Sequence, residues 1–314
     1  MTRKIIIDTD PGVDDAMAIF FAFQAKELEV LGLTTVFGNV PVSLATDNAL
    51  RLTEIAGVDV PVAEGVSVPS VIAPRPHPDF VHGTDGFGNI DWPAPKGKAV
   101  TLSAAEFIVE QVRKYPGEVT IVALAPLGNL AKALELDPEI ANLVDEVVLM
   151  GGTAHEFGNV SPVAEANVIN DPHAADKVFT ASWQVTMIGL DVTHQVVIGN
   201  TILERIKEKQ PEQGGFLYDC AQHYIKFYSD RFPIDGCYFH DASTIAYLLD
   251  PSLFTLERGP IRVACEGIAL GQTIFAPEGL SYPEPHWEGI PSTQVCMEVD
   301  DERLLKLYEE TMTA

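Results

Sequence analysis

The sequence predicts an α/β fold: an open, doubly wound, mostly parallel sheet flanked by helices, Rossmann-like, with a helical and β elaboration at the C-terminal end. Short apolar runs rich in β-branched residues recur, and most lack the alternation of a half-exposed strand, which is typical of strands covered on both faces. Segments with helical spacing of apolar residues lie between these runs. A strand–helix–strand order of this kind implies right-handed crossovers within one sheet.

The first part of the chain shows this alternation most clearly. The expected strands are KIII (4–7), VLGLTTVF (30–37), VTIVAL (119–124), EVVLM (146–150) and QVTMIGL (184–190). The expected helices between them are 14–26, 43–56, 103–114, 127–136 and 172–181. Ser103 is a favourable N-cap for its helix, and Pro172 suits the first turn of another.

The order changes after about residue 195. Helical spacing continues in 200–209, 214–229 and 241–249, and extended segments are expected at 253–275 and 292–299. The segment 65–98 holds many Gly, Pro and His residues with little periodicity, which predicts a long loop of the functional or mobile kind. No repeat or low-complexity linker divides the chain, so we expect residues 1–314 to form a single domain.

The charge balance limits the partners of the protein. The formal net charge is −25, from 45 acidic and 20 basic residues, and the acidic residues are spread along the chain. Such a charge repels phosphate backbones, so we expect no nucleic-acid partner. It suits a protein that handles a neutral ligand or a cation, although dispersed acidic residues often serve solubility alone.

The cysteines and the apolar segments indicate the compartment. Cys220, Cys237, Cys265 and Cys296 are far apart in sequence and form no CxxC pair, so we expect reduced thiols and neither zinc nor a disulfide framework. No apolar stretch approaches the roughly 20 residues that span a bilayer. A strand-like run begins within the first few residues, which leaves no room for a signal peptide. We therefore expect a soluble, cytoplasmic protein with no membrane partner.

Four aspartates follow the first apolar run, in the stretch IIIDTDPGVDDAMAI (5–19). Asp8 and Asp10 fall at the carboxyl end of the first expected strand, where open α/β sheets bind ligands, and Asp14 and Asp15 open the next helix. Complementing the helix dipole would explain one or two of these residues. It does not explain four, because close carboxylates repel one another unless a cation or a proton relieves them. The stretch therefore predicts a site for a hard divalent cation, Ca²⁺ or Mg²⁺, with helix capping as the alternative.

Two families share parts of this pattern. DTD at a strand end resembles the first motif of haloacid-dehalogenase-type phosphatases, but the threonine-containing helix start, the later lysine and the distal acidic pair of that family have no clear counterparts. DTDPGVDDAMAI is more similar to the N-terminal signature of the inosine–uridine-preferring nucleoside hydrolases. The resemblance continues in family order over about residues 4–251, in TTVFGN (34–39), HGTDGFG (82–88), ALAPLGNLA (123–131), EVVLMGG (146–152), GNVSPVAEANVINDPHAA (158–175), GLDVTHQ (189–195) and HDASTIAYLLDP (240–251).

The resemblance implies an enzyme that hydrolyses the N-glycosidic bond of ribonucleosides to free base and ribose, with one bound Ca²⁺. The implied calcium ligands are Asp10, Asp15, Asp241 and the backbone carbonyl of Leu124. Asp10 would also be the general base that takes a proton from a water molecule. Positive charge would develop on the ribose in an oxocarbenium-like transition state, which a pocket of carboxylates stabilises.

The resemblance also assigns substrate contacts. The residues implied to bind the ribose are Asp14, Asn39, Asn159, Glu165, Asn167 and Asp241, with Met150 packing nearby. His240 would be the acid that protonates the leaving base, Tyr224 and Tyr228 would contact the base, and His82 would close over the substrate. Without the resemblance, Asn39 would be a turn residue, the tyrosine pair would be core, and either histidine could be structural.

The loops at 66–80 and 273–292 contain many prolines, and we expect both to border the base pocket. The resemblance further implies a homotetramer or homodimer and a role in purine or pyrimidine salvage. A metal-dependent phosphatase and a non-catalytic nucleoside- or ribose-binding protein remain the alternatives, and the choice between purine and pyrimidine bases stays open.

Overall fold

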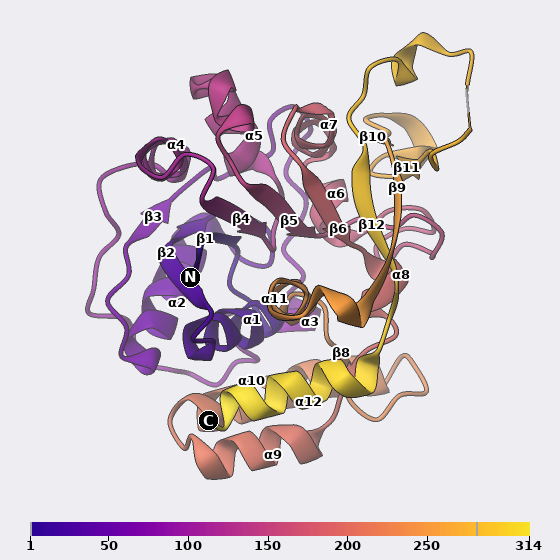
Figure 1. Cartoon of the computed structure of the whole chain (residues 1–314). Helices are drawn as coiled ribbons and strands as arrows, with labels where there is room; N and C mark the ends of the chain where they lie inside the picture. The colour runs from indigo at the N-terminus through magenta and orange to yellow at the C-terminus, as the bar shows by residue number, and fades with distance from the viewer. Residues whose placement is uncertain (1, 281) are drawn as a thin grey trace.

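The structure is a computed structural model that describes residues 2–280 and 282–314. Within these residues the main sheet has eight strands in the order β3-β2-β1-β4-β5-β6-β12-β9 (Figure 1). The strands are β1 (Arg3–Thr9), β2 (Leu28–Thr35), β3 (Val62–Glu64), β4 (Val119–Ala123), β5 (Glu146–Met150), β6 (Val185–Ile188), β9 (Phe254–Gly259) and β12 (Thr293–Val299). Two small sheets pair β7 (Val197–Ile198) with β8 (Cys237–Tyr238) and β10 (Ile261–Val263) with β11 (Thr273–Phe275).

The main sheet is parallel except at one edge, where β9 runs antiparallel to β12. Strand β1 lies inside the sheet between β2 and β4, with Asp8 opposite Thr34 on one side and Ala123 on the other. Since β1, β4 and β5 are parallel, their carboxyl ends meet at the same edge of the sheet. This edge brings residues from distant parts of the sequence together.

Helices cover both faces of the sheet, as Figure 1 shows. The helices are α1 (Val13–Gln24), α2 (Val42–Ala56), α3 (Asp79–His82), α4 (Ala104–Lys114), α5 (Gly128–Leu136), α6 (Ala166–Asn170), α7 (Pro172–Thr180), α8 (Leu190–Thr193), α9 (Asn200–Lys209), α10 (Gln213–Ser229), α11 (Ala242–Leu249) and α12 (Asp301–Met312). Short 3₁₀ turns are η1 (Pro138–Asn142), η2 (Pro251–Leu253), η3 (Gly267–Ala269) and η4 (Pro285–Trp287). Helices α4, α5 and α7 lie on one face, α1, α2 and α11 lie on the other, and α9, α10 and α12 form an outer layer beyond α1.

The alternation along β1 explains this division into two layers. Ile5 and Ile7 are buried in the core on the α1 side, whereas Ile6 is buried in the core on the α4 side. A strand covered on both faces has no polar side, which is why its sequence reads as a continuous apolar run. The predicted fold class is thus confirmed.

Some elements differ from their predicted form. The segment 253–275 is not one extended stretch but contains β9, the β10–β11 hairpin and the η3 turn. The strand expected over 184–190 ends at Ile188, because Gly189 caps the short helix α8. Strand β3 and helix α12 were not predicted: β3 has only three residues, and α12 follows the last predicted strand directly.

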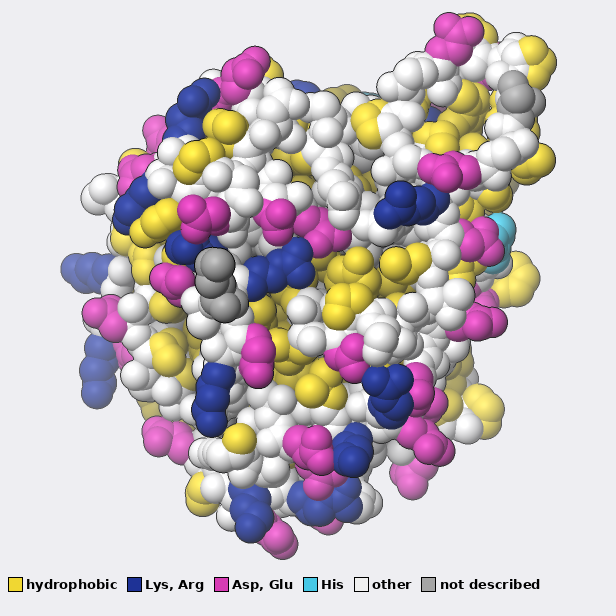
Figure 2. All heavy atoms as spheres, viewed as in Figure 1, with side chains coloured by type: hydrophobic (Ala, Val, Ile, Leu, Met, Phe, Trp, Pro, Cys, Tyr) yellow, Lys and Arg dark blue, Asp and Glu magenta, His cyan; other side chains and the backbone are white. Residues whose placement is uncertain are grey.

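The distribution of charged side chains on the surface agrees with the dispersed acidic residues of the sequence. Acidic and basic side chains are interspersed over the face drawn in Figure 2, without a single block of either sign. Among the described residues, no helix is both long enough and apolar enough to cross a bilayer. All four cysteines are described and none is in a disulfide; three are buried, and Cys265 is partly exposed.

Candidate active site

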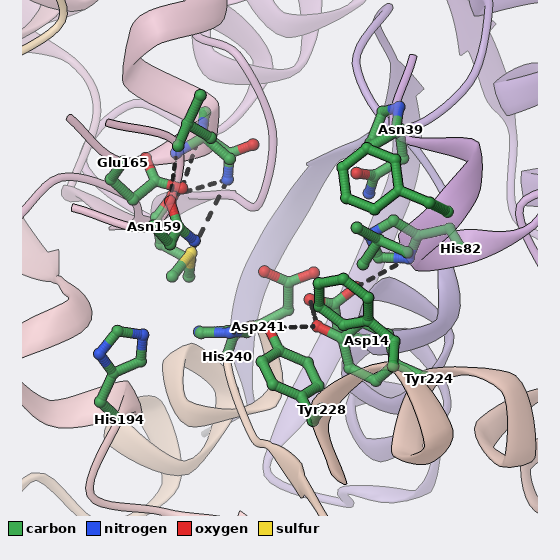
Figure 3. Close-up of a pocket in the computed structure, with 18 of the residues that line it drawn as sticks. Asp14, Asn39, His82, Asn159, Glu165, His194, Tyr224, Tyr228, His240 and Asp241 are labelled. Atoms are coloured by element: carbon green, nitrogen blue, oxygen red, sulfur yellow. Dashed lines mark hydrogen bonds and ion pairs between the residues drawn. The ribbon is translucent and has the colours of Figure 1, made fainter. Parts of the chain in front are cut away.

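A cavity of about 270 Å³ opens at the edge where β1, β4 and β5 end (Figure 3). Twelve of the predicted site residues line it: Asp14, Asn39, His82, Leu124, Met150, Asn159, Glu165, Asn167, Tyr224, Tyr228, His240 and Asp241. The other two, Asp10 and Asp15, are buried beside the cavity, and both accept hydrogen bonds from Asn39. The structure therefore brings together residues that lie up to 231 positions apart in the sequence, from Asp10 to Asp241.

The floor of the cavity is a cluster of buried carboxylates. One oxygen from each of Asp14, Asp15 and Asp241 lies within 4.8 Å of the others. Asp15 also caps α1, because its Oδ2 accepts the Gly12 N–H at 2.9 Å, and Thr9 donates its hydroxyl to Oδ1. The Tyr224 hydroxyl donates to Asp14 Oδ2 at 2.9 Å, whereas Asp14 Oδ1 is buried without a partner.

Burial and mutual repulsion perturb these acids. Burial raises the pKa of Asp14 to about 6, and burial together with the charge of Asp14 raises the pKa of Asp15 to about 6. The pKa of Asp241 lies well above its usual value, from burial first and then from the neighbouring carboxylates. Ionising all three would leave uncompensated charge in a dry site.

A divalent cation would relieve this cluster. Two oxygens that each bind Ca²⁺ at about 2.4 Å are at most about 4.8 Å apart. The spacing of the three carboxylates fits that limit, and the unpartnered Asp14 Oδ1 is available as a ligand atom. The cluster could therefore hold a metal ion.

Asp10 lies next to this cluster but is not part of it. Its Oδ2 accepts the Asn39 backbone N–H at 2.6 Å, and its Oδ1 accepts the Asn39 side-chain amide at 3.3 Å. The same amide donates to Asp15 Oδ2 at 3.1 Å. The three-carboxylate cluster contains Asp14, and Asp10, which the sequence predicted as a ligand, lies beside it in contact with Asn39. Burial, followed by the charge of Asp15, raises the pKa of Asp10 well above its usual value.

Asp8 supports the floor from below. Its Oδ1 accepts hydrogen bonds from the Thr34 hydroxyl at 2.6 Å and from the Asn129 amide at 2.8 Å, while Oδ2 is buried without a partner. Burial raises the pKa of Asp8 to about 7, against the effect of the two hydrogen bonds. Asn129 also donates to the Thr35 carbonyl, so that it ties the ends of β1 and β2 to helix α5.

One wall of the cavity comes from the loop before α6. Glu165 caps this helix, and its carboxylate accepts the backbone N–H groups of Gly152, Asn167 and Val168 at 2.8–3.0 Å. The Asn167 amide donates to the Leu124 carbonyl at 2.8 Å and to the Met150 carbonyl at 3.2 Å. This wall therefore presents amide and carboxylate groups beside the acidic floor.

The opposite wall carries a chain of hydrogen bonds that ends on the floor. His240 Nδ1 is 2.8 Å from the Thr193 hydroxyl, and its Nε2 is 2.8 Å from the Tyr228 hydroxyl. The Tyr228 and Tyr224 hydroxyls are 3.5 Å apart, and Tyr224 donates to Asp14. Burial lowers the pKa of His240 well below its usual value, so the ring is neutral at pH 7. This chain of hydrogen bonds runs from Thr193 to Asp14. Figure 3 shows its last four residues, which are His240, Tyr228, Tyr224 and Asp14.

His82 closes the side of the cavity next to α1. Its Nδ1 accepts the Val13 N–H at 3.3 Å and lies 3.8 Å from Asp14 Oδ1. Burial lowers the pKa of His82 to about 4, so no ion pair forms with Asp14 at neutral pH. The ring faces Tyr224, with 5.2 Å between the two ring centroids.

Several residues that line the cavity were not predicted. They form its mouth and its far side: Pro78, Phe80, Val81, Val160, Ala166, His194, Phe227, Arg231 and Phe232. His194 lay within a recognised motif, and Phe227 follows Tyr224 by three positions on the same helix face, so both could have been found. Pro78 and Phe80 of the loop at 66–80 line the cavity, as the expectation for that loop requires. The expectation for 273–292 is wrong, because no described residue of that segment lines the cavity.

Comparisons with known proteins agree with this geometry. A family model described as inosine-uridine preferring nucleoside hydrolase matches residues 5–306. A probable uridine nucleosidase 2 from Arabidopsis thaliana is 44% identical over 313 residues, which cover 99% of this chain and 97% of that protein. The inosine-uridine preferring nucleoside hydrolase of Crithidia fasciculata is 40% identical over 318 residues, covering 99% and 98%. A solved plant nucleoside hydrolase superposes with a TM-score of 0.96 at 42% identity, covering 100% of both chains.

A parallel sheet with an acidic cavity at its carboxyl edge, together with these relatives, defines the protein as a ribonucleoside hydrolase. The chain belongs to the inosine-uridine preferring nucleoside hydrolase family. The predicted resemblance is therefore confirmed. The comparisons favour it over both alternatives, the haloacid-dehalogenase-type phosphatase and the non-catalytic binding protein.

Proposed function

We propose that the protein hydrolyses the N-glycosidic bond of ribonucleosides in a calcium-dependent reaction, with water as the nucleophile. The observation that carries the proposal is the buried cluster of Asp14, Asp15 and Asp241, whose oxygens lie within 4.8 Å of one another at the floor of the cavity. Asp15, Asp241 and the Leu124 carbonyl would hold the ion, with either Asp10 or Asp14 as a further ligand. A bound Ca²⁺ would neutralise these carboxylates and lower the pKa of a neighbouring water molecule.

The ribose would lie across the floor. Its hydroxyl groups both donate and accept hydrogen bonds, and the carboxylates of Asp14 and Asp241 and the amides of Asn39 and Asn167 supply the complementary groups. Asn159 and Glu165 would bind the remaining hydroxyl from the α6 side. Since these contacts require hydroxyl groups at several positions, they favour ribonucleosides over deoxyribonucleosides.

Asp10 is the proposed general base. Asn39 fixes its carboxylate beside the cluster, within reach of a water molecule held there, which is the geometry that a general base requires. The attacking water loses its proton to Asp10 as its oxygen bonds to C1′ of the ribose. The carboxylates of the floor stabilise the positive charge that the sugar develops while the base leaves.

The departing base gains a proton through the Tyr228–His240 pair. Burial lowers the pKa of His240 and raises that of Tyr228, so neither group is a strong acid by itself. The Tyr228 hydroxyl, 2.8 Å from His240 Nε2, would pass its proton to the base as negative charge develops there, and it would take a proton back from solvent water after the base has left. This assigns Tyr228 the direct contact with the base and His240 the task of supporting it. Tyr224 and His82 complete the wall against which the base packs.

The relatives' names suggest substrates and setting. Since similar proteins are named for uridine and inosine, we propose these nucleosides as substrates and nucleoside salvage in the cytoplasm as the role. A homodimer or homotetramer is the proposed assembly, which analytical ultracentrifugation would test directly.

The test compares calcium-loaded protein with protein stripped by a chelator. Release of reducing sugar from inosine, adenosine, guanosine, uridine and cytidine should disappear on stripping and return with Ca²⁺. Calorimetric titration gives a second readout, because Asp241→Asn should weaken calcium binding at least about tenfold while the exposed Asp219→Asn should leave it unchanged. No sugar from any nucleoside, with calcium bound, would refute the proposal, as would full turnover in the stripped protein.

A further inference from the structure

An exposed cationic side chain, Arg231, lines the cavity beside two aromatic rings whose centroids are 5.8 Å apart. Its Cζ lies 4.0 Å from the centroid of the Phe227 ring and 5.9 Å from that of Phe80. Phe227 belongs to the end of α10 and Phe80 to α3, so the guanidinium joins the two segments that frame the opening. The contact with the Phe227 ring restrains the guanidinium, whose N–H groups can still donate to other partners.

Most of the donors of this arginine remain available. Nη1 donates to the Phe227 carbonyl at 3.2 Å, and this is the hydrogen bond that the structure gives to the Arg231 side chain. A guanidinium carries five N–H donors and no acceptor, so its free edge can bind only hydrogen-bond acceptors. The side chain lines the cavity and is exposed to solvent there.

The charge of Arg231 contrasts with the rest of the cavity. Among the described residues that line it, Arg231 is the sole lysine or arginine and is exposed, whereas the acidic lining residues Asp14, Glu165 and Asp241 are buried. The cavity is therefore negative where the ribose is proposed to lie and positive at its mouth. Breaking the glycosidic bond moves electrons from the sugar to the base, so a hydrogen bond from Arg231 to a carbonyl oxygen of the base becomes stronger in the transition state.

We propose that Arg231 is a specificity-determining residue that donates to the exocyclic carbonyl oxygen on the distal edge of the leaving base. This inference rests on the proposed function, because it requires the ribose to lie on the acidic floor and the base to point toward the mouth of the cavity. Uracil and hypoxanthine carry a carbonyl oxygen at that edge, whereas cytosine and adenine carry an amino group. An amino group at that position would place its N–H donors against those of the guanidinium and leave both groups without an acceptor. The site therefore selects bases with a carbonyl oxygen at this edge.

The test is Arg231→Met, which keeps an apolar stem on the two rings and removes charge and donors. Values of kcat/KM are measured for uridine, cytidine and p-nitrophenyl riboside, whose leaving group has no base edge. The kcat/KM of the variant should fall about tenfold for uridine, which is the usual effect of losing one charge-assisted hydrogen bond. It should fall about twofold or less for cytidine and p-nitrophenyl riboside. Lys226→Met is the matched control, because it removes a positive charge from the same helix end but does not line the cavity. It should leave the ratio of uridine to cytidine activity unchanged.

The outcomes separate this inference from the proposed function. If the unaltered enzyme releases no ribose from any nucleoside, the proposed function fails. If it is active and Arg231→Met loses equally on all three substrates, the residue has only a structural role and the inference is overturned. An unchanged uridine-to-cytidine ratio in Arg231→Met, or a change of equal size in Lys226→Met, would overturn it as well.

Discussion

Replacing Asp8 by asparagine should change how the stability of the metal-free protein depends on pH. Burial raises the pKa of Asp8 from 3.8 to about 7 in the folded protein. Because the folded-state pKa is the higher one, the contribution of Asp8 to stability is complete below pH 3.8 and is lost as the pH rises through about 7. The full loss is about 4 kcal/mol.

Asparagine keeps the geometry while removing the ionisation. Thr34 and Asn129 both donate to Oδ1, so the amide oxygen of Asp8→Asn can accept the same hydrogen bonds. Its NH₂ group would occupy the position of Oδ2, which is buried without a partner and therefore adds a cost that does not vary with pH. The buried histidines His82 and His240 titrate in the opposite direction, but they do so in both proteins and cancel in the difference.

Urea unfolding in the presence of a chelator measures the effect. The free energy of unfolding of Asp8→Asn minus that of the unaltered protein should increase by roughly 3 to 4 kcal/mol between about pH 4 and pH 8. The exposed Asp59→Asn serves as the control and should show no such increase. Parallel pH profiles for Asp8→Asn and the unaltered protein would refute the reasoning.

Two further substitutions test the walls of the cavity. Tyr228→Phe removes the hydroxyl that lies 2.8 Å from His240 Nε2, so kcat on inosine and uridine should fall about 10- to 100-fold. The loss on p-nitrophenyl riboside should be small, because its leaving group needs no proton. Equal losses on all three substrates would show that Tyr228 does not protonate the base. Glu165→Gln should lower the free energy of unfolding by about 1 to 3 kcal/mol, because an amide NH₂ would face backbone donors that the carboxylate now satisfies. Urea titration beside the exposed Glu156→Gln measures this loss, and equal stability of the two variants would contradict it.

The sequence predicted the elements whose signal is local. Continuous apolar runs located the inner strands of the parallel sheet, because a strand that is buried on both faces has apolar residues at successive positions. The rule that ligands bind beyond the carboxyl ends of such strands then placed the aspartates of the first signature at the cavity. The helix α12 was missed although Leu304, Tyr308 and Met312 repeat at helical spacing after the N-cap Asp300, so its signal was present.

Other features depend on contacts that no local pattern contains. The hydrogen bond between Thr193 and His240 joins residues 47 positions apart. Burial among distant segments lowers the pKa of His240, so its neutral state also depends on the tertiary fold. The close approach of Asp14, Asp15 and Asp241, with Asp10 hydrogen-bonded to Asn39 beside them, joins distant parts of the chain and cannot be read from spacing along the sequence. Arg231 lies in an irregular segment, and only the packing of α3 against α10 brings it over the opening.

The two outer strands of the main sheet have a consequence for aggregation. An exposed, regular edge strand is a template on which another chain can add by backbone hydrogen bonding. At one edge β3 has only three residues, and Val100 already donates to its Val62 carbonyl. At the other edge β9 carries the exposed charged residues Glu257 and Arg258. Both edge strands therefore disfavour the addition of a strand from another molecule, which protects this eight-stranded sheet from edge-to-edge aggregation.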